Sequence, residues 1–209
     1  MNRKGSRPSR GTRHSASSLF KKNMASVHDS ISLYEGIVKL RVGLNTDWLL
    51  RGAVVFLVSA LDTYFHDRIK YGISGVSGDM PAALLRHRIT IGDLEDWEDA
   101  RRKGNVIRNW IAEHLSTVPL QSPDRIAEYM RYIGVEQLWN KVEPDNTKRK
   151  KILDKLNEII TRRNQIAHEG DRLSGRGSGK RLRGIALDTV TDWIKFIDGL
   201  ITTIDAKVT

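Results

Sequence analysis

Arg163, Asn164 and His168 are the residues whose types and spacing are best suited to chemistry. Asn164 and His168 are four residues apart, so on a helix they lie on the same face. Arg163 continues the apolar stripe of the residues before it, where a charged side chain needs a partner because an unpaired buried charge is costly. Gly170 is a typical residue for ending a helix. We therefore expect a cation, an amide and an imidazole to meet at one helix terminus.

This combination suits cleavage of RNA without a metal ion or other cofactor. A histidine titrates near neutral pH and can move a proton to or from the ribose 2′-hydroxyl. An arginine keeps its charge and can bind two phosphate oxygens in the transition state. We predict that His168 is the acid or base, that Arg163 stabilises the phosphate and that Asn164 orients them.

An arginine and a histidine at this spacing also occur together by chance. Arg108, followed by Asn109, forms a second arginine–histidine pair with His114 that is one residue longer. His168 also suits the role of an ordinary histidine at a helix C-terminus, where the helix dipole favours a positive charge.

Long stretches without proline, separated by glycine-rich segments, predict a helical protein. Apolar residues recur with the helical period, and no two-residue alternation is long enough to predict a sheet. We expect an all-α bundle of about five to seven helices. The predicted helices span about residues 18–42, 47–71, 81–87, 93–115, 122–139 (one helix or a pair), 144–170 and 187–204.

The predicted helix at 47–71 is apolar on all sides over its middle part, which indicates a central, buried helix. Asp62 and His66 interrupt this part at helical spacing, and buried polar groups need partners. Two arrangements remain open: Asp62 pairs with Arg163, or Asp62 pairs with His66 one turn along the same helix. In either case we expect Asp62 and His66 to support the site.

The chain has 209 residues, a formal net charge of +10 and no cysteine. The lack of cysteine excludes disulfides, thiolate metal sites and cysteine nucleophiles. Much of the excess positive charge lies near the N-terminus, so we expect a disordered basic tail at 1–25 and one helical domain at 26–209. The composition of the tail suits a nucleic-acid contact, a dispensable solubilising extension or a transit peptide.

The most apolar run, residues 52–61, is far shorter than the roughly 20 residues of a membrane-spanning helix. No apolar stretch follows the basic N-terminus, so no secretory signal is predicted. We expect a cytoplasmic protein without a membrane partner.

Basic residues flank the candidate site in the sequence, and those after it lie in a Gly- and Arg-rich loop at 173–184. Such residues suit contact with an RNA backbone, although a solvated loop has the same composition. The loop lacks the glycine spacing of a P-loop. The predicted RNA-binding residues are Lys148, Lys151, Arg162, Arg172, Arg176, Lys180, Arg181 and Arg183.

Residues 163–168 resemble the Arg-x4–6-His signature of HEPN domains, in the form with a polar residue directly after the arginine. Residues 48–67 resemble an early core helix of the branch called RiboL-PSP-HEPN. The resemblance extends over about residues 28–205. It favours Arg163 and His168 over the earlier pair, because the family places its signature in the penultimate long helix.

The resemblance implies a helical homodimer in which two signature helices meet at a composite site. It also implies a metal-independent endoribonuclease that leaves 2′,3′-cyclic phosphate ends, with Arg163 and His168 as the catalytic pair and Asn164 in support. Many such proteins are toxins or phage-defence effectors, so an antitoxin or a defence-system protein is an expected partner. The alternative is a non-catalytic HEPN module that binds RNA or a protein. Gly170 stands where one HEPN subgroup has a tyrosine that receives an inactivating nucleotide, so that control is not expected.

Overall fold

The computed structural model describes residues 15–73, 82–86, 91–92, 95, 98, 103–173 and 181–208. These residues form an all-α fold, which confirms the predicted class, and the isolated bridge between Arg172 and Leu182 is the sole strand-like pairing in the described ranges. Two of the helices, α3 and α7, are only four and five residues long. The elements are α1 (Ala16–Leu40), α2 (Asp47–Ile73), α3 (Ala82–Leu85), α5 (Lys103–Ser116), α6 (Pro123–Met130), the 3-10 helix η1 (Arg131–Ile133), α7 (Leu138–Val142), α8 (Asn146–Glu169) and α9 (Leu187–Lys207).

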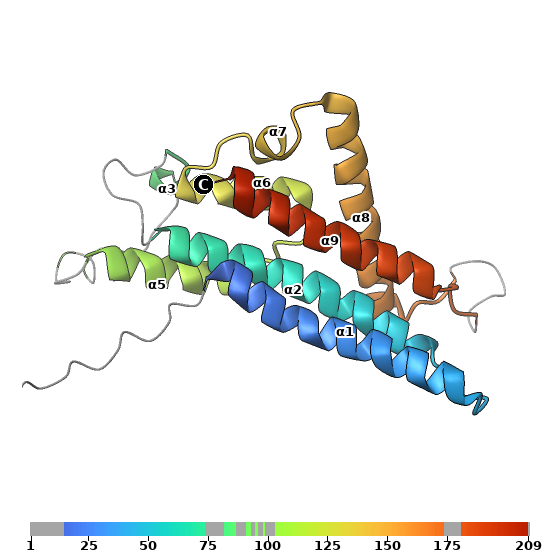
Figure 1. Cartoon of the computed structure of the whole chain (residues 1–209). Helices are drawn as coiled ribbons and strands as arrows, with labels where there is room; N and C mark the ends of the chain where they lie inside the picture. The colour runs from blue at the N-terminus through green and yellow to red at the C-terminus, as the bar shows by residue number, and fades with distance from the viewer. Residues whose placement is uncertain are drawn as a thin grey trace, which may run out of the picture.

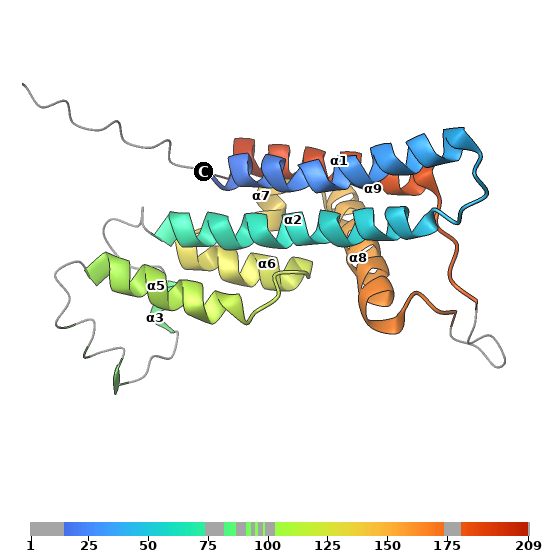
Figure 2. The ribbon, with the colours of Figure 1, turned by 90° about the horizontal axis from the view of Figure 1, so that it is seen from below.

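Helix α2 is the centre of the core, as its apolar sequence predicts. Figures 1 and 2 show α1 and α9 lying along one side of α2, with α5 and α6 along the other and α8 crossing the group. Leu50, Leu57 and Leu61 of α2 are fully buried. Removing such side chains from water supplies the main driving force for this packing.

By length and composition α2 also resembles a membrane-crossing helix. It contains an 18-residue window with a mean hydropathy of 1.4, which is longer than the apolar run at 52–61. The same window is 56% buried inside the protein. Packing against α1, α5, α8 and α9 accounts for the apolar composition of this helix.

Helix α1 begins earlier than the predicted domain boundary. Ser15 caps it, because the Ser15 side chain accepts a hydrogen bond from the backbone N–H of Ser18 at 3.1 Å. Phe20 and Met24 are then buried in the core at 2% and 4% exposure. The prediction of a disordered tail over 1–25 is therefore wrong for residues 16–25, and residues 1–14 lie outside the described part of the chain.

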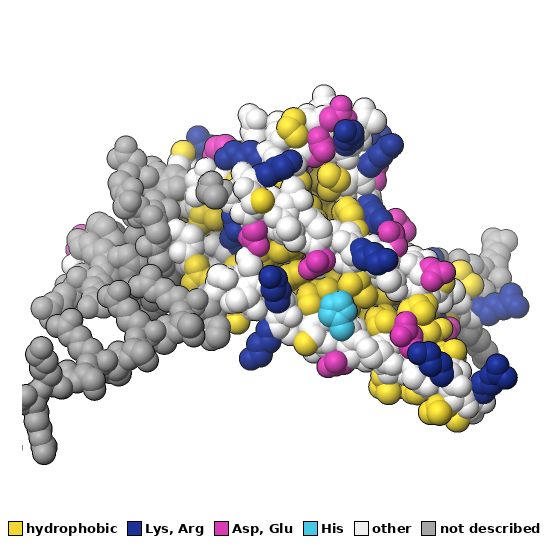
Figure 3. Space-filling model, viewed as in Figure 1, with side chains coloured by type: hydrophobic (Ala, Val, Ile, Leu, Met, Phe, Trp, Pro, Cys, Tyr) yellow, Lys and Arg dark blue, Asp and Glu magenta, His cyan; other side chains and the backbone are white. Residues whose placement is uncertain are grey.

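The end of the α1–α2 hairpin exposes apolar side chains. Leu40 is 71% exposed, Val42 53%, Leu44 68% and Trp48 62%. Figure 3 shows hydrophobic side chains gathered at this end of the hairpin. We call these four residues the apolar tip. A patch of this kind typically marks an interaction surface.

Helix α8 carries the candidate site. It begins after Asp145, whose side chain accepts from the N–H of Lys148 at 2.8 Å, and it ends at Gly170, which adopts the left-handed conformation with φ of 61°. Leu156 and Ile159 of its apolar stripe are fully buried. The end predicted at Gly170 is confirmed, and this places His168 in the last turn.

The turn that follows helix α5 faces α8 across the candidate site. Ser122 caps α6 by accepting from the N–H of Arg125, and Pro123 occupies the first helical turn, as expected from this pair of residues. Most of the first ten residues of the helix predicted at 93–115 lie outside the described residues. Residues 117–122, called the site turn below, connect α5 to α6.

Candidate active site

Arg163, Asn164 and His168 lie together on the wall of one open cleft at the C-terminal end of α8. The cleft has a volume of about 520 Å³. Pro119 and Gln121 of the site turn line it with these three residues and Glu169. The predicted proximity of a cation, an amide and an imidazole at the end of a helix is thus confirmed. The roles assigned to these residues stay predictions.

The guanidinium of Arg163 is held against the neighbouring amide. Its Nη1 donates to Oδ1 of Asn164 at 3.0 Å. Its Nε is buried and has no hydrogen-bond partner among the described residues. A charge-assisted hydrogen bond to Asn164 fixes the orientation of the guanidinium and leaves other N–H groups for an anion. His168 is exposed to solvent beside it.

Asp62 of α2 lies behind the site turn. Its Oδ1 accepts from the N–H of Leu120 at 2.7 Å, and its Oδ2 is 3.7 Å from Nδ1 of His66. Burial raises the pKa of the Asp62 carboxyl, opposed by the charge of His66, the Leu120 N–H and the charge of Arg163. Of the two arrangements left open by the sequence, the structure has the contact with His66; Arg163 acts on Asp62 only through its longer-range charge.

Asp171 is a site-supporting residue that sequence reasoning missed. Its side chain is 2% exposed, and its backbone has a left-handed φ of 57° directly after Gly170. Arg51 of α2 donates to Oδ2 of Asp171 at 2.6 Å, and Arg162 of α8 binds both of its carboxylate oxygens. This clamp joins the end of α8 to α2, three residues beyond His168. The one sign in the sequence was Arg51, a charged residue within the apolar sequence of α2 that needs a buried partner.

Arg162, which was predicted to bind RNA, has its guanidinium bound to Asp171 in this clamp. Its side chain is 11% exposed and also donates to the backbone carbonyl of Gly184 at 2.9 Å. Burial lowers the pKa of the Arg162 guanidinium, opposed by the charge of Asp171. Both of its terminal nitrogens donate to groups of the protein itself.

The other predicted RNA-binding residues after the signature divide into three groups. Arg172 and Arg181 are exposed at the base of the Gly- and Arg-rich loop, close to the end of α8. Arg183 is partly buried and lies 3.7 Å from the carboxylate of Glu169. Arg176 and Lys180 lie outside the described residues.

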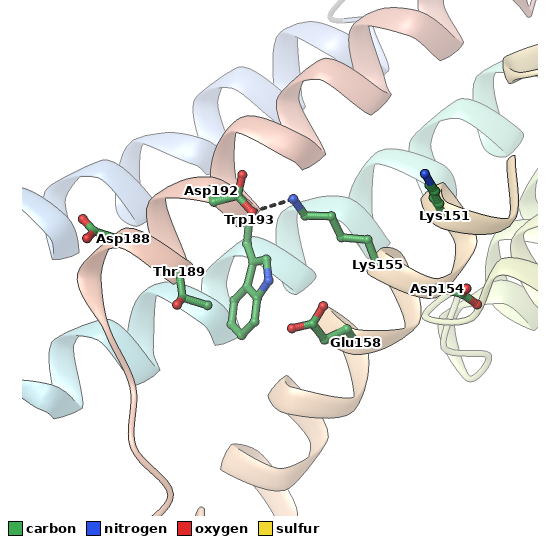
Figure 4. Close-up of a pocket in the computed structure, with 8 residues that line it drawn as sticks. All are labelled: Lys151, Asp154, Lys155, Glu158, Asp188, Thr189, Asp192 and Trp193. Atoms are coloured by element: carbon green, nitrogen blue, oxygen red, sulfur yellow. Dashed lines mark hydrogen bonds and ion pairs between the residues drawn. The ribbon is translucent and has the colours of Figure 1, made fainter. Parts of the chain in front are cut away.

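The basic residues before the signature lie at the far end of α8. Twenty residues separate Lys148 from His168, which corresponds to about 30 Å along a helix. Lys151 lines another cavity, between α8 and α9, in which Lys155 Nζ lies 2.5 Å from Asp192 (Figure 4). Within one chain, Lys148 and Lys151 therefore do not join the candidate site. The carboxylates that line the second cavity disfavour phosphate there: Asp154, Glu158, Asp188 and Asp192.

The second arginine–histidine pair has a different setting. His114 of α5 stacks on Tyr129, and its Nε2 lies 3.1 Å from the Tyr129 hydroxyl. The side chain of Arg108 lies outside the described set. Over the described part of the chain, no group of three or more His, Asp and Glu side chains is arranged to hold a metal ion.

Comparison with known proteins gives one match. The sequence model of the RiboL-PSP-HEPN family matches residues 20–209, which includes all of the site residues described above. Neither the curated proteins nor the solved structures contain a significant match to the chain.

Proposed function

The chain belongs to the RiboL-PSP-HEPN family, and from this premise we propose that it is a metal-independent endoribonuclease. Membership suggests a ribonuclease or an RNA-binding module. The observation that favours catalysis is the cleft at the end of α8, where Arg163, Asn164 and His168 lie side by side. A module that only binds RNA needs basic residues, but it has no need of an exposed imidazole beside a held guanidinium.

In the proposed reaction, the ribose 2′-oxygen attacks the adjacent phosphorus and the bond from phosphorus to the 5′-oxygen breaks. His168 accepts the proton of the 2′-hydroxyl. Arg163 pairs with the non-bridging oxygens, whose charge grows in the transition state, and Asn164 keeps the guanidinium in place. The leaving 5′-oxygen takes a proton from solvent or from a second copy of His168. The products are a 2′,3′-cyclic phosphate and a 5′-hydroxyl.

A homodimer is part of the proposal. The cleft is open, and one copy supplies one arginine and one histidine to it. The apolar tip supports an interface close by, because Arg51, one turn after Trp48, binds Asp171 beside the end of α8. A second copy docked there would bring a second signature helix toward the same RNA.

Arg172 and Arg181 are the described residues best placed to hold the RNA backbone, since both are exposed near the cleft. We further propose that the protein acts in the cytoplasm as a toxin or a phage-defence effector, with an antitoxin or a defence-system protein as its partner. The support for this role is the family resemblance.

The test is cleavage of single-stranded RNA by the purified protein in excess chelator. His168→Ala and Arg163→Ala should each lower the cleavage rate by about a hundredfold or more, because acid–base and charge stabilisation each contribute on that order. His28→Ala, which changes an exposed histidine of α1, is the matched control and should cleave normally. Cleavage that requires a metal ion, or that survives in both site variants, would defeat the mechanism. RNA binding without cleavage would support the non-catalytic alternative.

A further inference from the structure

His66 of α2 has an oxygen acceptor at each of its two ring nitrogens. Nδ1 lies 2.8 Å from the backbone carbonyl oxygen of Asp62. Nε2 lies 2.9 Å from the carbonyl oxygen of Leu115 and 3.1 Å from that of Val118. The side chain is partly buried, with 24% of its surface exposed.

A carbonyl oxygen only accepts hydrogen bonds, so each ring nitrogen must donate to satisfy these contacts. Neutral imidazole has one N–H, whereas the imidazolium cation has two. We propose that His66 is held as an imidazolium cation and that, together with Asp62, it fixes the site turn that forms one wall of the candidate cleft. The charge of His66 follows from geometry alone, whereas its importance for catalysis rests on the proposed function.

His66 and Asp62 bind the site turn through complementary hydrogen-bonding groups. His66 donates to the carbonyls of Leu115 and Val118, at the end of α5 and the start of the turn. Asp62, one helical turn earlier, accepts from the N–H of Leu120. It also accepts from the side chain of Gln121, which lines the cleft. The cationic side chain thus binds carbonyl groups, the anionic side chain binds N–H groups, and both fix the same short segment at 115–121.

Charged and neutral groups from three elements surround this pair. The Asp62 carboxylate is 3.7 Å from Nδ1 of His66, and Asp67 on the same helix also interacts with the charge of His66. From α8, Arg163 faces Asp62. From α5 and the site turn, the groups in contact are neutral: the two backbone carbonyls and the amide of Gln121.

In a neutral His66, one of the two ring nitrogens has a lone pair instead of a proton and cannot donate to its carbonyl oxygen. If that nitrogen is Nε2, the contacts with Leu115 and Val118 are lost together. The site turn, with Pro119 and Gln121, would then be held by Asp62 alone. His66 is therefore a positioning residue, because it acts on the cleft through the turn and does not line the cleft itself.

The charge is tested by nitrogen NMR of the histidine rings in the full-length protein at neutral pH. We expect both ring nitrogens of His66 to carry a proton, with its signals assigned by their loss in His66→Gln. Should that variant fail to fold, the His66 signals are identified instead by their displacement in Asp62→Asn, which changes the carboxylate 3.7 Å from Nδ1. One unprotonated nitrogen in the wild-type ring would overturn the proposal.

The stabilisation of the site turn by His66 is tested by amide hydrogen exchange at Leu120. His66→Gln should speed this exchange at least tenfold, and the matched variant His28→Gln should leave it unchanged. Equal exchange in both variants would overturn the positioning role. In RNA cleavage, His66→Gln should lower kcat/KM while His168 is intact. Absence of cleavage by the wild type would count against the proposed function only, since the NMR and exchange results do not depend on it.

Discussion

The carboxylate of Asp171 is enclosed between Arg51 and Arg162, and its side chain is 2% exposed. Removing one partner from a buried ion pair is costly, because it leaves an uncompensated charge away from water. In this clamp two arginines depend on one carboxylate, and the clamp holds the end of α8 that bears His168.

Asp171→Asn should therefore destabilise the protein by about 3 kcal/mol. Chemical denaturation followed by circular dichroism measures this change in the free energy of unfolding. Glu169→Gln is the matched control, since its carboxylate is 55% exposed and pairs with Arg183 at 3.7 Å. It should cost less than about 1 kcal/mol. Equal losses in the two variants would argue against a dominant role for the clamp.

Residue spacing predicted the core of the site but not its supports. Arg163, Asn164 and His168 are close in sequence, so helical geometry alone brings them to one cleft. Arg51 and Asp171 are 120 residues apart, and no local pattern indicates their contact. Arg162 was assigned to RNA because a basic residue beside a candidate site has the same sequence appearance whether its partner is a phosphate or a buried carboxylate.

At the scale of elements, periodicity predicted the long helices well, because each must bury one face. The boundary between the tail and the helical domain was placed too late, at residue 26, although a helix was expected from about residue 18. Phe20, Met24 and Val27 form the buried stripe of α1, but Lys21 and Lys22 between them give the segment the composition of a tail. The distance of Lys148 and Lys151 from the candidate site was also missed. These two lysines lie near the start of α8, which is 24 residues long, whereas His168 lies in its last turn.

Phe20→Ala should lower the free energy of unfolding by about 3–5 kcal/mol, the usual cost of emptying a buried aromatic position. The neighbouring exposed residue provides the control, and Lys21→Ala should change stability by less than about 0.5 kcal/mol. Thermal and urea unfolding of the two variants makes the comparison. A small effect of Phe20→Ala would mean that the first turns of α1 do not belong to the core.

At the scale of the whole molecule, the net charge of +10 is a poor guide to the site. Some basic side chains near the signature are occupied by carboxylates, as Arg162 is by Asp171 and Lys155 by Asp192. The more informative surface is the apolar tip, which is exposed in the described part of the chain and whose Trp48 lies one helical turn before Arg51, a partner of Asp171.

Trp48→Glu should shift the protein from dimer to monomer, because a charge in the centre of an apolar interface is left without a partner. Light scattering during size-exclusion chromatography measures the mass. Tyr71→Glu is the matched control, since this aromatic residue is 45% exposed at the opposite end of α2. A wild-type protein that is monomeric at micromolar concentration, or a Trp48→Glu variant that stays dimeric, would exclude the apolar tip as the dimer interface.

The chemical identity of the RNA ends is the most direct test of catalysis by Arg163 and His168. A single-stranded RNA is incubated with the purified protein in excess chelator, alongside a copy in which the 2′-hydroxyl at the cut position is replaced by hydrogen. The proposed reaction gives 2′,3′-cyclic phosphate and 5′-hydroxyl ends from the first RNA, no cut at the changed position of the second, and no cut with His168→Ala. A 3′-hydroxyl end, or a cut at the position without a 2′-hydroxyl, would contradict it.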